Sequence, residues 1–379
     1  MQTSNEDNLI ENESNLIEGA LQILRERLPS GWTVGRTAGP GVVDKESDAL
    51  FSFSPQAGMS GGVALIEARR NFAAADVDRL LGGLTRRLRE TSTGWPIVLV
   101  SDFLSPRTRD LLAREDIGYV DLTGNVRLVM RNPGMFIETS GNDHRPSGTG
   151  AKRAAGLAGV KAGQIIRFLV EVVPPYGVLD IEQATRISRG YVSRVLERLA
   201  DEALIEREKR GPVMRADWPA LLRRRGQSVG LFGASTVRTY VSPSGSKSAF
   251  EALRQSRFRD NIVVTGSFAA VRVAPVAAPT LLVLYLDGLT FDPVVESLGL
   301  WPADESPDVV LLRPSNMSVL DNPRPVDGLQ MVGLPQLVID CLGGVGRMPS
   351  EGEAVLDWMQ TNETVWRYPS LDEYLRARR

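Results

Sequence analysis

A chain of 379 residues is too long for a single ordinary core, so the sequence predicts two or three domains. Apolar residues make up 42% of it and charged residues 24%, proportions that favour a globular protein and exclude a disordered or membrane-spanning one. The formal net charge of -2 by itself neither favours nor excludes nucleic acid as a partner.

The rarest residue types exclude further kinds of site. The only cysteine, Cys341, rules out an internal disulfide, and the only histidine, His144, rules out most zinc sites, which draw on several Cys or His ligands. Any bound metal would therefore have to sit on carboxylates. We expect no metal and no cofactor. The acidic, polar first residues differ from a signal peptide, and no apolar run of about 18 residues follows, so we expect no membrane association and a cytoplasmic location.

Residues 1–139 alternate between helical and strand patterns. Apolar residues at helical spacing between positions 16 and 24 mark a first helix, and a second helical pattern begins after Phe72. A third helix is expected after Ser105, with Ser105 as its cap and Pro106 in its first position. The expected strands are, in chain order, Trp32–Arg36, Ala49–Phe53, Val63–Ala68, Pro96–Val100, Gly118–Leu122 and Val126–Met130. This order predicts an α/β domain with a mixed sheet.

Three residues of this domain lie where a nuclease site would. Asp48 precedes one expected strand, and Glu67 and Arg69 lie at the end of the next. This arrangement resembles the PD-(D/E)XK nuclease fold, in which two carboxylates hold a divalent ion and a lysine polarises the attacking water. Here an arginine replaces the lysine, and arginine keeps its proton and positions a single water poorly. The alternative is that Asp48 and Glu67 are ordinary acids at strand ends, and we expect no catalytic residue.

A tight hairpin is predicted between two apolar strands over residues 117–128, IGYVDLTGNVRL. Gly124 and Asn125 tolerate a positive φ, and Asp121 can bond the backbone amides of the turn. The turn accounts for all three residue types, so we expect them to be structural.

The next region differs in composition and charge. Residues 140–159 are rich in Gly, Ser and small residues and are interpreted as a linker. Residues 152–225 hold 15 Lys and Arg against 9 Asp and Glu, whereas the rest of the chain is acidic. An electropositive third in an otherwise acidic chain favours a nucleic-acid partner.

Residues 160–226 show three helical patterns in succession. The first ends before Pro174, because proline cannot continue a helix. The second is expected to begin at Asp180, whose carboxylate would cap it while Gln183 completes a capping box. The third is expected over about Tyr191–Leu204, with one apolar stripe buried.

The third helix is expected to follow a turn at Ser188–Gly190, and residues 205–216 predict two short strands that form a wing. A helix fits the major groove of DNA, and the fork of an arginine pairs two acceptors on guanine or on a phosphate. The residues expected to contact DNA are Arg189, Ser193, Arg194 and Arg198 around this helix, and Lys209 and Arg210 in the wing.

The segment that contains these residues has a family resemblance. Residues 187–208, ISRGYVSRVLERLADEALIERE, are similar to the recognition helix and wing of MarR-type and related winged-helix regulators. The resemblance implies a winged helix-turn-helix that binds double-stranded DNA. The alternative is a winged helix that binds only protein, with its arginines as a solvated face. The local positive charge favours DNA.

Residues 227–379 return to α/β patterns. A strand that ends at Gly266 and Ser267, followed by a helix and a buried strand, resembles the start of the nucleotidyltransferase fold. That family has metal-binding acids where this chain has Ala278–Thr280, and Asp287 lies alone beyond this place. Without two carboxylates no magnesium pair is held, so the resemblance implies an inert, transferase-like domain. A helix, a glycine turn and a second helix are expected over residues 334–359.

These features occur together in one further family. A winged helix followed by a degenerate nucleotidyltransferase-like domain, with the VDLTGNVRL turn ahead of both, resembles the AbiEi-type antitoxins of type IV toxin-antitoxin systems. The resemblance spans most of residues 100–370 and implies a repressor of its own operon, with a nucleotidyltransferase toxin as partner. The chain departs from the family by its extra N-terminal α/β domain, which leaves the toxin partner open, and a homodimer is left open as well.

We therefore expect a multidomain protein of the α+β or α/β class. Its parts are a PD-(D/E)XK-like α/β domain over residues 1–139, a winged helix-turn-helix over 160–226 and a nucleotidyltransferase-like α/β domain over 227–379. The expected function is sequence-specific DNA binding by a non-enzymatic transcriptional regulator. The alternatives are a metal-dependent nuclease, whose N-terminal domain cuts where the middle domain binds, and a pure protein-interaction module.

Overall fold

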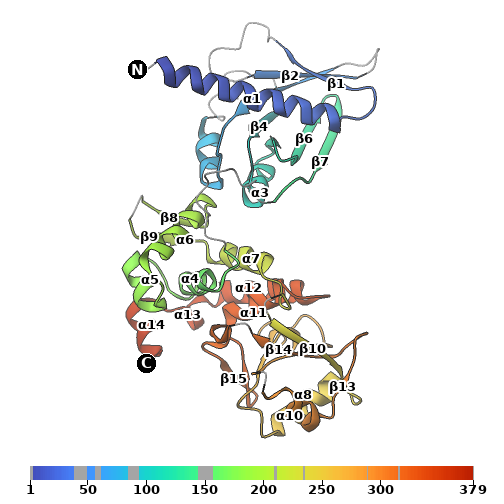
Figure 1. The fold of residues 1–379 in the computed structure, drawn as a ribbon, viewed down its shortest axis with the longest axis vertical. Coiled ribbons are helices and arrows are strands. Elements are labelled where there is room, and N and C mark those ends of the chain that lie inside the picture. The colour runs from blue at the N-terminus through green and yellow to red at the C-terminus, as the bar shows by residue number, and fades with distance from the viewer. Residues whose placement is uncertain are drawn as a thin grey trace. The chain divides into compact units, whose positions relative to one another are not determined.

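The computed structural model describes residues 3–37, 49–55, 61–83, 94–143, 157–208, 211–233, 235–287, 289–314 and 316–378. The chain divides into two compact units, of which unit 1 holds Met1–Arg153 with Ala200–Ala203 and unit 2 holds Ala154–Leu199 with Leu204–Arg379. Both units combine helices with a mixed sheet, so the fold is α+β (Figure 1). Within the described ranges, no helix combines the length and the apolar character needed to cross a membrane.

Unit 1 contains a mixed sheet with helices on both faces. Its elements are α1 (Thr3–Arg27), β1 (Thr33–Thr37), β2 (Ala49–Ser54), β3 (Gly62–Ala68), the 3-10 turn η1 (Ala74–Asp76), β4 (Ile97–Ser101), α3 (Pro106–Arg114), β5 (Gly118–Asp121), β6 (Val126–Arg131) and β7 (Gly134–Thr139). The strands lie in chain order across the sheet, with β3, β4 and β5 parallel and the other neighbours antiparallel.

Two apolar clusters hold the layers of unit 1 together. On one face, α1 packs its buried leucines against side chains such as Phe51 and Val98 of the sheet. On the other face, Leu112 of α3 and Val77 pack against Leu99 of β4. Because β4 presents Val98 to one cluster and Leu99 to the other, it is buried on both sides, as its continuous apolar run predicts.

Most of the expected elements of unit 1 form within a residue or two of their predicted bounds. The hydroxyl of Ser105 accepts the amide of Thr108 at 3.2 Å, and Pro106 opens α3, as predicted. Strand β7, which pairs with β6 at the edge of the sheet, was not among the predicted strands. After Phe72 the structure has η1 and then helix over residues 77–83, and the rest of that expected helix lies outside the described residues.

The turn between β5 and β6 depends on one buried carboxylate. Asp121 accepts the amides of Leu104, Thr123 and Asn125 at 2.9 to 3.1 Å. Gly124 has a φ of 97°, as expected. Asn125 does not adopt a positive φ, and its side chain donates to Asp121 at 2.9 Å. The prediction that this segment is structural agrees with these contacts.

Unit 2 has a helical region and a sheet region. Its elements are α4 (Val160–Glu171), α5 (Val178–Thr185), α6 (Arg189–Asp201), β8 (Ile205–Arg207), β9 (Val213–Ala216), α7 (Trp218–Ser228), β10 (Ser235–Val241), α8 (Ser246–Gln255), β11 (Val263–Thr265), α9 (Ser267–Ala270), β12 (Leu282–Tyr285), α10 (Phe291–Leu298), β13 (Trp301–Pro302), β14 (Val309–Pro314), the 3-10 turn η2 (Met317–Leu320), β15 (Arg324–Val326), β16 (Leu329–Met331), α11 (Leu334–Leu342), α12 (Met348–Thr361), α13 (Glu363–Trp366) and α14 (Leu371–Ala377). The strand order in the described sheet is β13-β10-β14-β12-β11-β16-β15.

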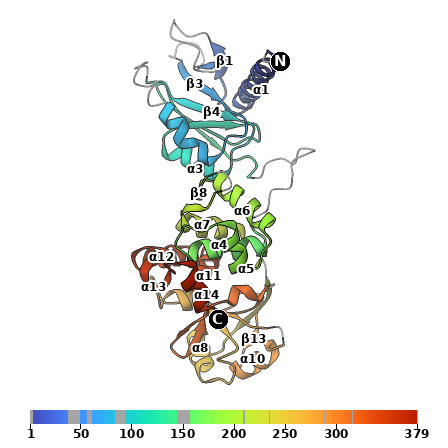
Figure 2. The ribbon, with the colours of Figure 1, turned by 90° about the vertical axis from the view of Figure 1, so that its left-hand side faces the viewer.

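The two regions of unit 2 interleave in sequence but separate in space. In both views α4, α5, α7, α11 and α12 lie together, and β13 lies apart from them with α8 and α10 (Figures 1 and 2). Figure 1 places β10 and β14 in this second group. The C-terminal α14 returns to the helical region and contacts α5. Helices α11 and α12 flank a glycine turn, as the sequence predicts.

The boundary between α5 and α6 differs from the prediction. Helix α5 begins two residues before Asp180, whose carboxylate accepts the amide of Gly177 at 2.7 Å from within the first turn. The chain turns at Arg186, which has a φ of 59°, and α6 already includes Arg189 and Gly190. The turn therefore lies about two residues earlier than expected, and α5 also begins two residues earlier because its capping residue is Gly177.

Candidate nucleic-acid interface

Helix α6 is amphipathic and has one open face. It is 13 residues long and buries Val192, Val195, Leu196 and Leu199. Arg189 and Arg194 are exposed, and Ser193 and Arg198 are half-buried. Arg189, Ser193 and Arg194 all lie in the first two turns, so the sequence-predicted side chains converge on the N-terminal half of the helix.

The two exposed arginines of α6 have different surroundings. Arg189 forms an ion pair with Glu182 of α5, with 2.6 Å between Nε and Oε2, and its side chain remains 67% exposed. The guanidinium of Arg194 lies over the ring of Tyr191, 5.6 Å from the centroid. Exposed ion pairs contribute at most about 1 kcal/mol to stability, so Arg189 can exchange its carboxylate partner for a phosphate at little cost.

A two-stranded hairpin follows α6 directly. Strands β8 and β9 are antiparallel, and Glu206 pairs across them with Arg215 at 2.9 Å. Tyr176, in the segment between α4 and α5, exchanges backbone hydrogen bonds with Val213 of β9 and forms an isolated antiparallel bridge beside the hairpin. The expected wing residues Lys209 and Arg210 lie outside the described residues.

Sequence reasoning missed two basic residues beside this surface. Arg186 is exposed and lies at the turn that precedes α6, and Arg215 is exposed on the hairpin. Arg186 could have been found from its position between the helical patterns, had the turn been placed correctly. Arg215 could have been found from the alternation of the second wing strand.

The number of basic residues in 152–225 overstates the positive charge at the surface of this region. Arg223 forms a two-pronged ion pair with Glu353 of α12, with a shortest distance of 2.7 Å. Arg167 is only 7% exposed, and Arg225 faces a cavity inside unit 2. Arg167 and Arg225 thus face the interior of unit 2, and the charge of Arg223 is compensated by Glu353, so part of the positive charge counted in the sequence is not presented at the surface.

The residues compared with a nuclease site have internal contacts of their own. Glu67 is 4% exposed at the end of β3 and forms an ion pair with Arg69. Arg69 also donates to the carbonyl of Ala68 at 2.8 Å. Both side chains border a cleft that also includes Arg79. Asp48 lies outside the described residues.

The residues compared with a transferase site are also engaged. Gly266 has a φ of 63° ahead of α9, and the buried hydroxyl of Ser267 donates to Glu351 of α12 at 2.5 Å. Asp287 is exposed and accepts the amides of Leu289 and Thr290 at 2.9 and 3.1 Å, so it caps a turn.

Comparisons with known proteins add no relative. A scan against protein-family models, a search of curated proteins and a search of solved structures each returned no match to this chain.

Proposed function

We propose that this protein is a sequence-specific DNA-binding transcriptional regulator, in which α4, α5, α6 and the β8–β9 hairpin form a winged helix-turn-helix. One observation carries the proposal: the open face of α6 bears Arg189 and Arg194, and the helix is followed at once by an antiparallel hairpin. The bridge between Tyr176 and Val213 supports the same motif, because it connects the segment before α5 to the hairpin.

The dimensions of α6 suit a recognition helix. Its 13 residues span about 20 Å, and the major groove of B-DNA admits a helix of this kind. Recognition helices present their N-terminal residues to base edges. In the proposal Arg189 and Arg194 contact phosphates and guanine edges and Ser193 contacts a phosphate. Arg198 lies one turn further along, and Lys209 and Arg210 contact the neighbouring backbone from the wing.

We further propose that the regulator is a repressor of the AbiEi-like antitoxin type, with a nucleotidyltransferase toxin as partner. The sequence resemblance supports this assignment. The contact between Ser267 and Glu351 also supports it, because a serine hydroxyl held by a buried carboxylate in the protein is not free for a nucleotide. In this proposal the sheet region of unit 2 has no transferase activity.

The regulator is preferred to the alternative nuclease because of the surroundings of Glu67. A metal ion would have to compete with Arg69 for its carboxylate, and an arginine at that position keeps its proton. Incubation with plasmid DNA and Mg²⁺ should therefore leave the plasmid intact. Metal-dependent cutting that is lost in Glu67→Ala would favour the nuclease instead.

Fluorescence anisotropy tests the regulator. We expect the full chain to bind duplexes from its own upstream region, with an affinity that falls steeply as salt rises. The double variant Arg189→Ala/Arg194→Ala should lose about tenfold or more in affinity and reduce the salt slope by about two. Arg259→Ala is the matched control, because Arg259 is an exposed arginine of the sheet region. Equal affinities of the double variant and the control would contradict the proposal.

A further inference from the structure

The two exposed arginines of α6 differ in how far the protein already uses their hydrogen-bond donors. Arg189 gives its Nε to the carboxylate of Glu182 at 2.6 Å. Arg194 is exposed, and no hydrogen bond or ion pair joins it to another residue in the described part of the chain. A two-pronged contact with a base needs two free donors on one guanidinium. Arg194 therefore has the donors that such a contact requires.

The guanidinium of Arg194 lies over the first turn of its own helix. A Cβ added at Gly190, four residues earlier, would be 3.9 Å from Nη1 of Arg194. The same guanidinium lies 5.6 Å from the ring centroid of Tyr191, three residues earlier. Side chains of a helix point back toward its N-terminus, so both contacts follow from this spacing. The charge of Arg194 thus lies at the end of α6 that a recognition helix presents to base edges.

Tyr191 restrains this guanidinium without using its donors. A cation over an aromatic face is attracted by the ring itself, so the N–H groups stay available for hydrogen bonds to another molecule. A side chain that is restrained before binding also loses less conformational freedom when it binds. The contact between Tyr191 and Arg194 therefore favours a specific contact over a loose one.

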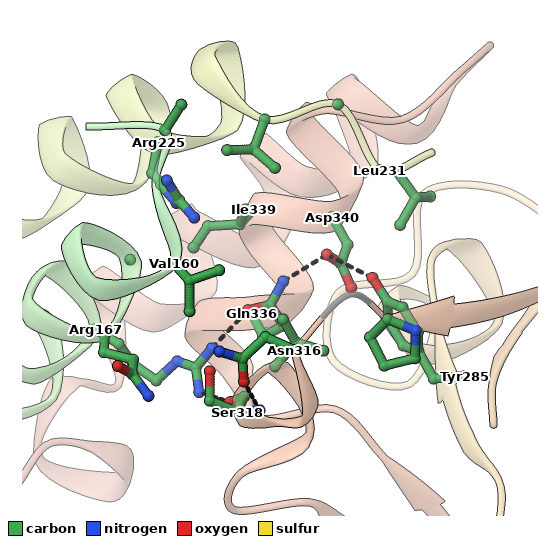
Figure 3. Close-up of a pocket in the computed structure, with 17 residues that line it drawn as sticks. Val160, Arg167, Arg225, Leu231, Tyr285, Asn316, Ser318, Gln336, Ile339 and Asp340 are labelled. Carbon is green, nitrogen blue, oxygen red and sulfur yellow. Dashed lines mark hydrogen bonds between the residues drawn. The ribbon is translucent and has the colours of Figure 1, made fainter. Parts of the chain in front are cut away.

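Tyr191 also has a charged neighbour in the interior of unit 2. It is half-buried, and its phenol group lies close enough to Arg225 of α7 to act on the pKa of that residue. Burial lowers the pKa of Arg225 to about 10, the charge of Arg167 acts in the same direction, and Tyr191 acts against both. Arg225 lies in the wall of a cavity between the helical and the sheet region (Figure 3). Tyr191 therefore has one exposed guanidinium and one internal guanidinium as neighbours.

The internal guanidinium depends on a glycine of α4. A Cβ added at Gly163 would be 2.6 Å from Nη2 of Arg225, so a side chain there would displace this group. Glycine is unfavourable inside a helix, and the close approach of Arg225 explains why it occurs at this position.

We infer that Arg194 contacts the O6 and N7 atoms of a guanine in the bound DNA, and that Tyr191 is the positioning residue for this contact. Guanine is the base that presents two acceptors in the major groove, whereas adenine presents an acceptor and a donor. A guanidinium carries donors only, so it matches guanine. Arg189, whose Nε is already engaged, contacts a phosphate instead. The inference rests on the proposed DNA binding and adds the kind of base pair that α6 recognises.

Duplexes that contain 7-deazaguanine test the inference. This base lacks the N7 acceptor but keeps its base pairing and its phosphates. Fluorescence anisotropy compares a duplex from the protein's own upstream region with the same duplex carrying 7-deazaguanine at all its guanines. We expect the wild type to bind the substituted duplex about fivefold or more weakly, since a charge-assisted hydrogen bond is lost.

Single variants assign this difference to one arginine. Arg194→Ala should bind more weakly than the wild type and should bind both duplexes equally. Arg189→Ala is the matched control, because it removes the same charge from the same end of α6. It should also bind more weakly, but it should keep the wild-type preference for the unsubstituted duplex.

Two variants of Tyr191 test its positioning role. Tyr191→Leu keeps every charge but removes the aromatic face, so we expect about two- to fivefold weaker binding of the unsubstituted duplex and little change for the substituted one. Tyr191→Phe keeps an aromatic face and should retain the wild-type preference. Circular dichroism checks that both variants are folded.

The outcomes distinguish this inference from the proposed function. If the wild type binds neither duplex, both fail. If the wild type binds both duplexes equally, or if Arg194→Ala keeps the wild-type preference, the guanine contact is wrong and the proposed DNA binding stands. A wild-type preference in folded Tyr191→Leu would overturn the positioning role of Tyr191.

Discussion

At the scale of single residues, Glu182 controls the charge of the proposed DNA-binding face. Its carboxylate lies 2.6 Å from Nε of Arg189, on a surface that should meet phosphates. A DNA phosphate and Glu182 would compete for the same guanidinium. The positive residues of α6 therefore do not act independently of α5.

Replacing this acid should strengthen DNA binding. In Glu182→Ala we expect about fivefold tighter binding at low salt, because one nearby charge interacts by about 1 kcal/mol in water. Anisotropy with the same duplex measures the change. Glu251→Ala, which removes an exposed acid from α8, is the control and should leave the affinity unchanged. Weaker binding by Glu182→Ala would show that Arg189 needs this carboxylate to be positioned.

Asp340 makes the free energy of unfolding depend on pH. Burial raises its pKa from 3.8 to about 6, against the opposing effects of hydrogen bonds from Thr265, Gln336 and Tyr285 and of the charge of Arg167. The folded state thus binds this proton more tightly than the unfolded state. The contribution of Asp340 to stability is largest below pH 4 and is lost as the pH rises to about 6.

The variant Asp340→Asn should remove this contribution. Relative to the wild type, its free energy of unfolding should improve by up to about 3 kcal/mol between pH 4 and pH 6, since one pKa unit corresponds to about 1.4 kcal/mol. Urea unfolding at a series of pH values measures the difference. A difference between the two proteins that stays constant over this range would contradict the raised pKa.

Among the elements, the turn between α5 and α6 affects both the stability of the fold and the proposed DNA binding. Arg186 has the left-handed conformation, with φ 59° and ψ 23°, which costs a non-glycine residue about 1 kcal/mol. It also exposes its charge beside the first turn of α6. A glycine at position 186 would therefore stabilise the backbone, but it would remove a positive charge that can contact DNA.

Two substitutions of Arg186 separate these effects. Arg186→Gly should raise the free energy of unfolding by up to about 1 kcal/mol and reduce the salt slope of DNA binding by about one, through the loss of a phosphate contact. Arg186→Ala should weaken DNA binding equally without the gain in stability. Thermal unfolding and anisotropy measure the two properties. Unchanged DNA affinity in both variants would place Arg186 outside the interface.

The sequence predicts elements better than it predicts their ends. Ser105 and Pro106 mark the start of α3 correctly, because the cap is a local hydrogen bond. Asp180 was expected to be the cap but lies at the third helical position, where it accepts the amide of the capping residue Gly177, because acidic residues are favourable at both positions. Strand β7 was missed because Phe136 faces solvent under Arg127, 5.6 Å from its ring centroid, which blurs the alternation of the strand.

Some residues of the candidate sites could be predicted from the sequence and others could not. The arginines of α6 could be read from the helical period, because exposure follows from the buried stripe on the same element. The cavity of Arg167 and Arg225 could not, because it depends on how α4, α7 and α11 pack. The sequence contains Gly163 and Arg225, but nothing local relates the missing side chain of one to the guanidinium of the other.

At the scale of the whole molecule, the helical region of unit 2 is completed by the C-terminal segment. Arg223 of α7 is ion-paired with Glu353 of α12. The amide of Tyr368 donates to the carbonyl of Glu171 at the end of α4, at 2.8 Å. Helix α7 packs closely on α11, since a Cβ added at Gly226 would be 2.7 Å from a neighbouring leucine.

These contacts predict how fragments behave. A fragment of residues 157–226 should lack cooperative unfolding, because it loses the apolar surface that α11 and α12 cover. A fragment of residues 157–378 should unfold cooperatively. Circular dichroism during heating compares them. If residues 157–226 alone unfold as sharply as the longer fragment, the helical region is an independent domain and the contacts above are dispensable.

The proposed function places the N-terminal half of α6 on DNA, and a tethered cleavage reagent measures this placement directly. Cys341 is buried, so Cys341→Ser gives a background in which one introduced cysteine carries the reagent. Gly190→Cys places it at the exposed first turn of α6, and Lys247→Cys places it on exposed α8 as the control. We expect localised cutting of bound duplex from position 190 and none from position 247. Cutting from position 247 alone, or equal cutting from both, would contradict the account.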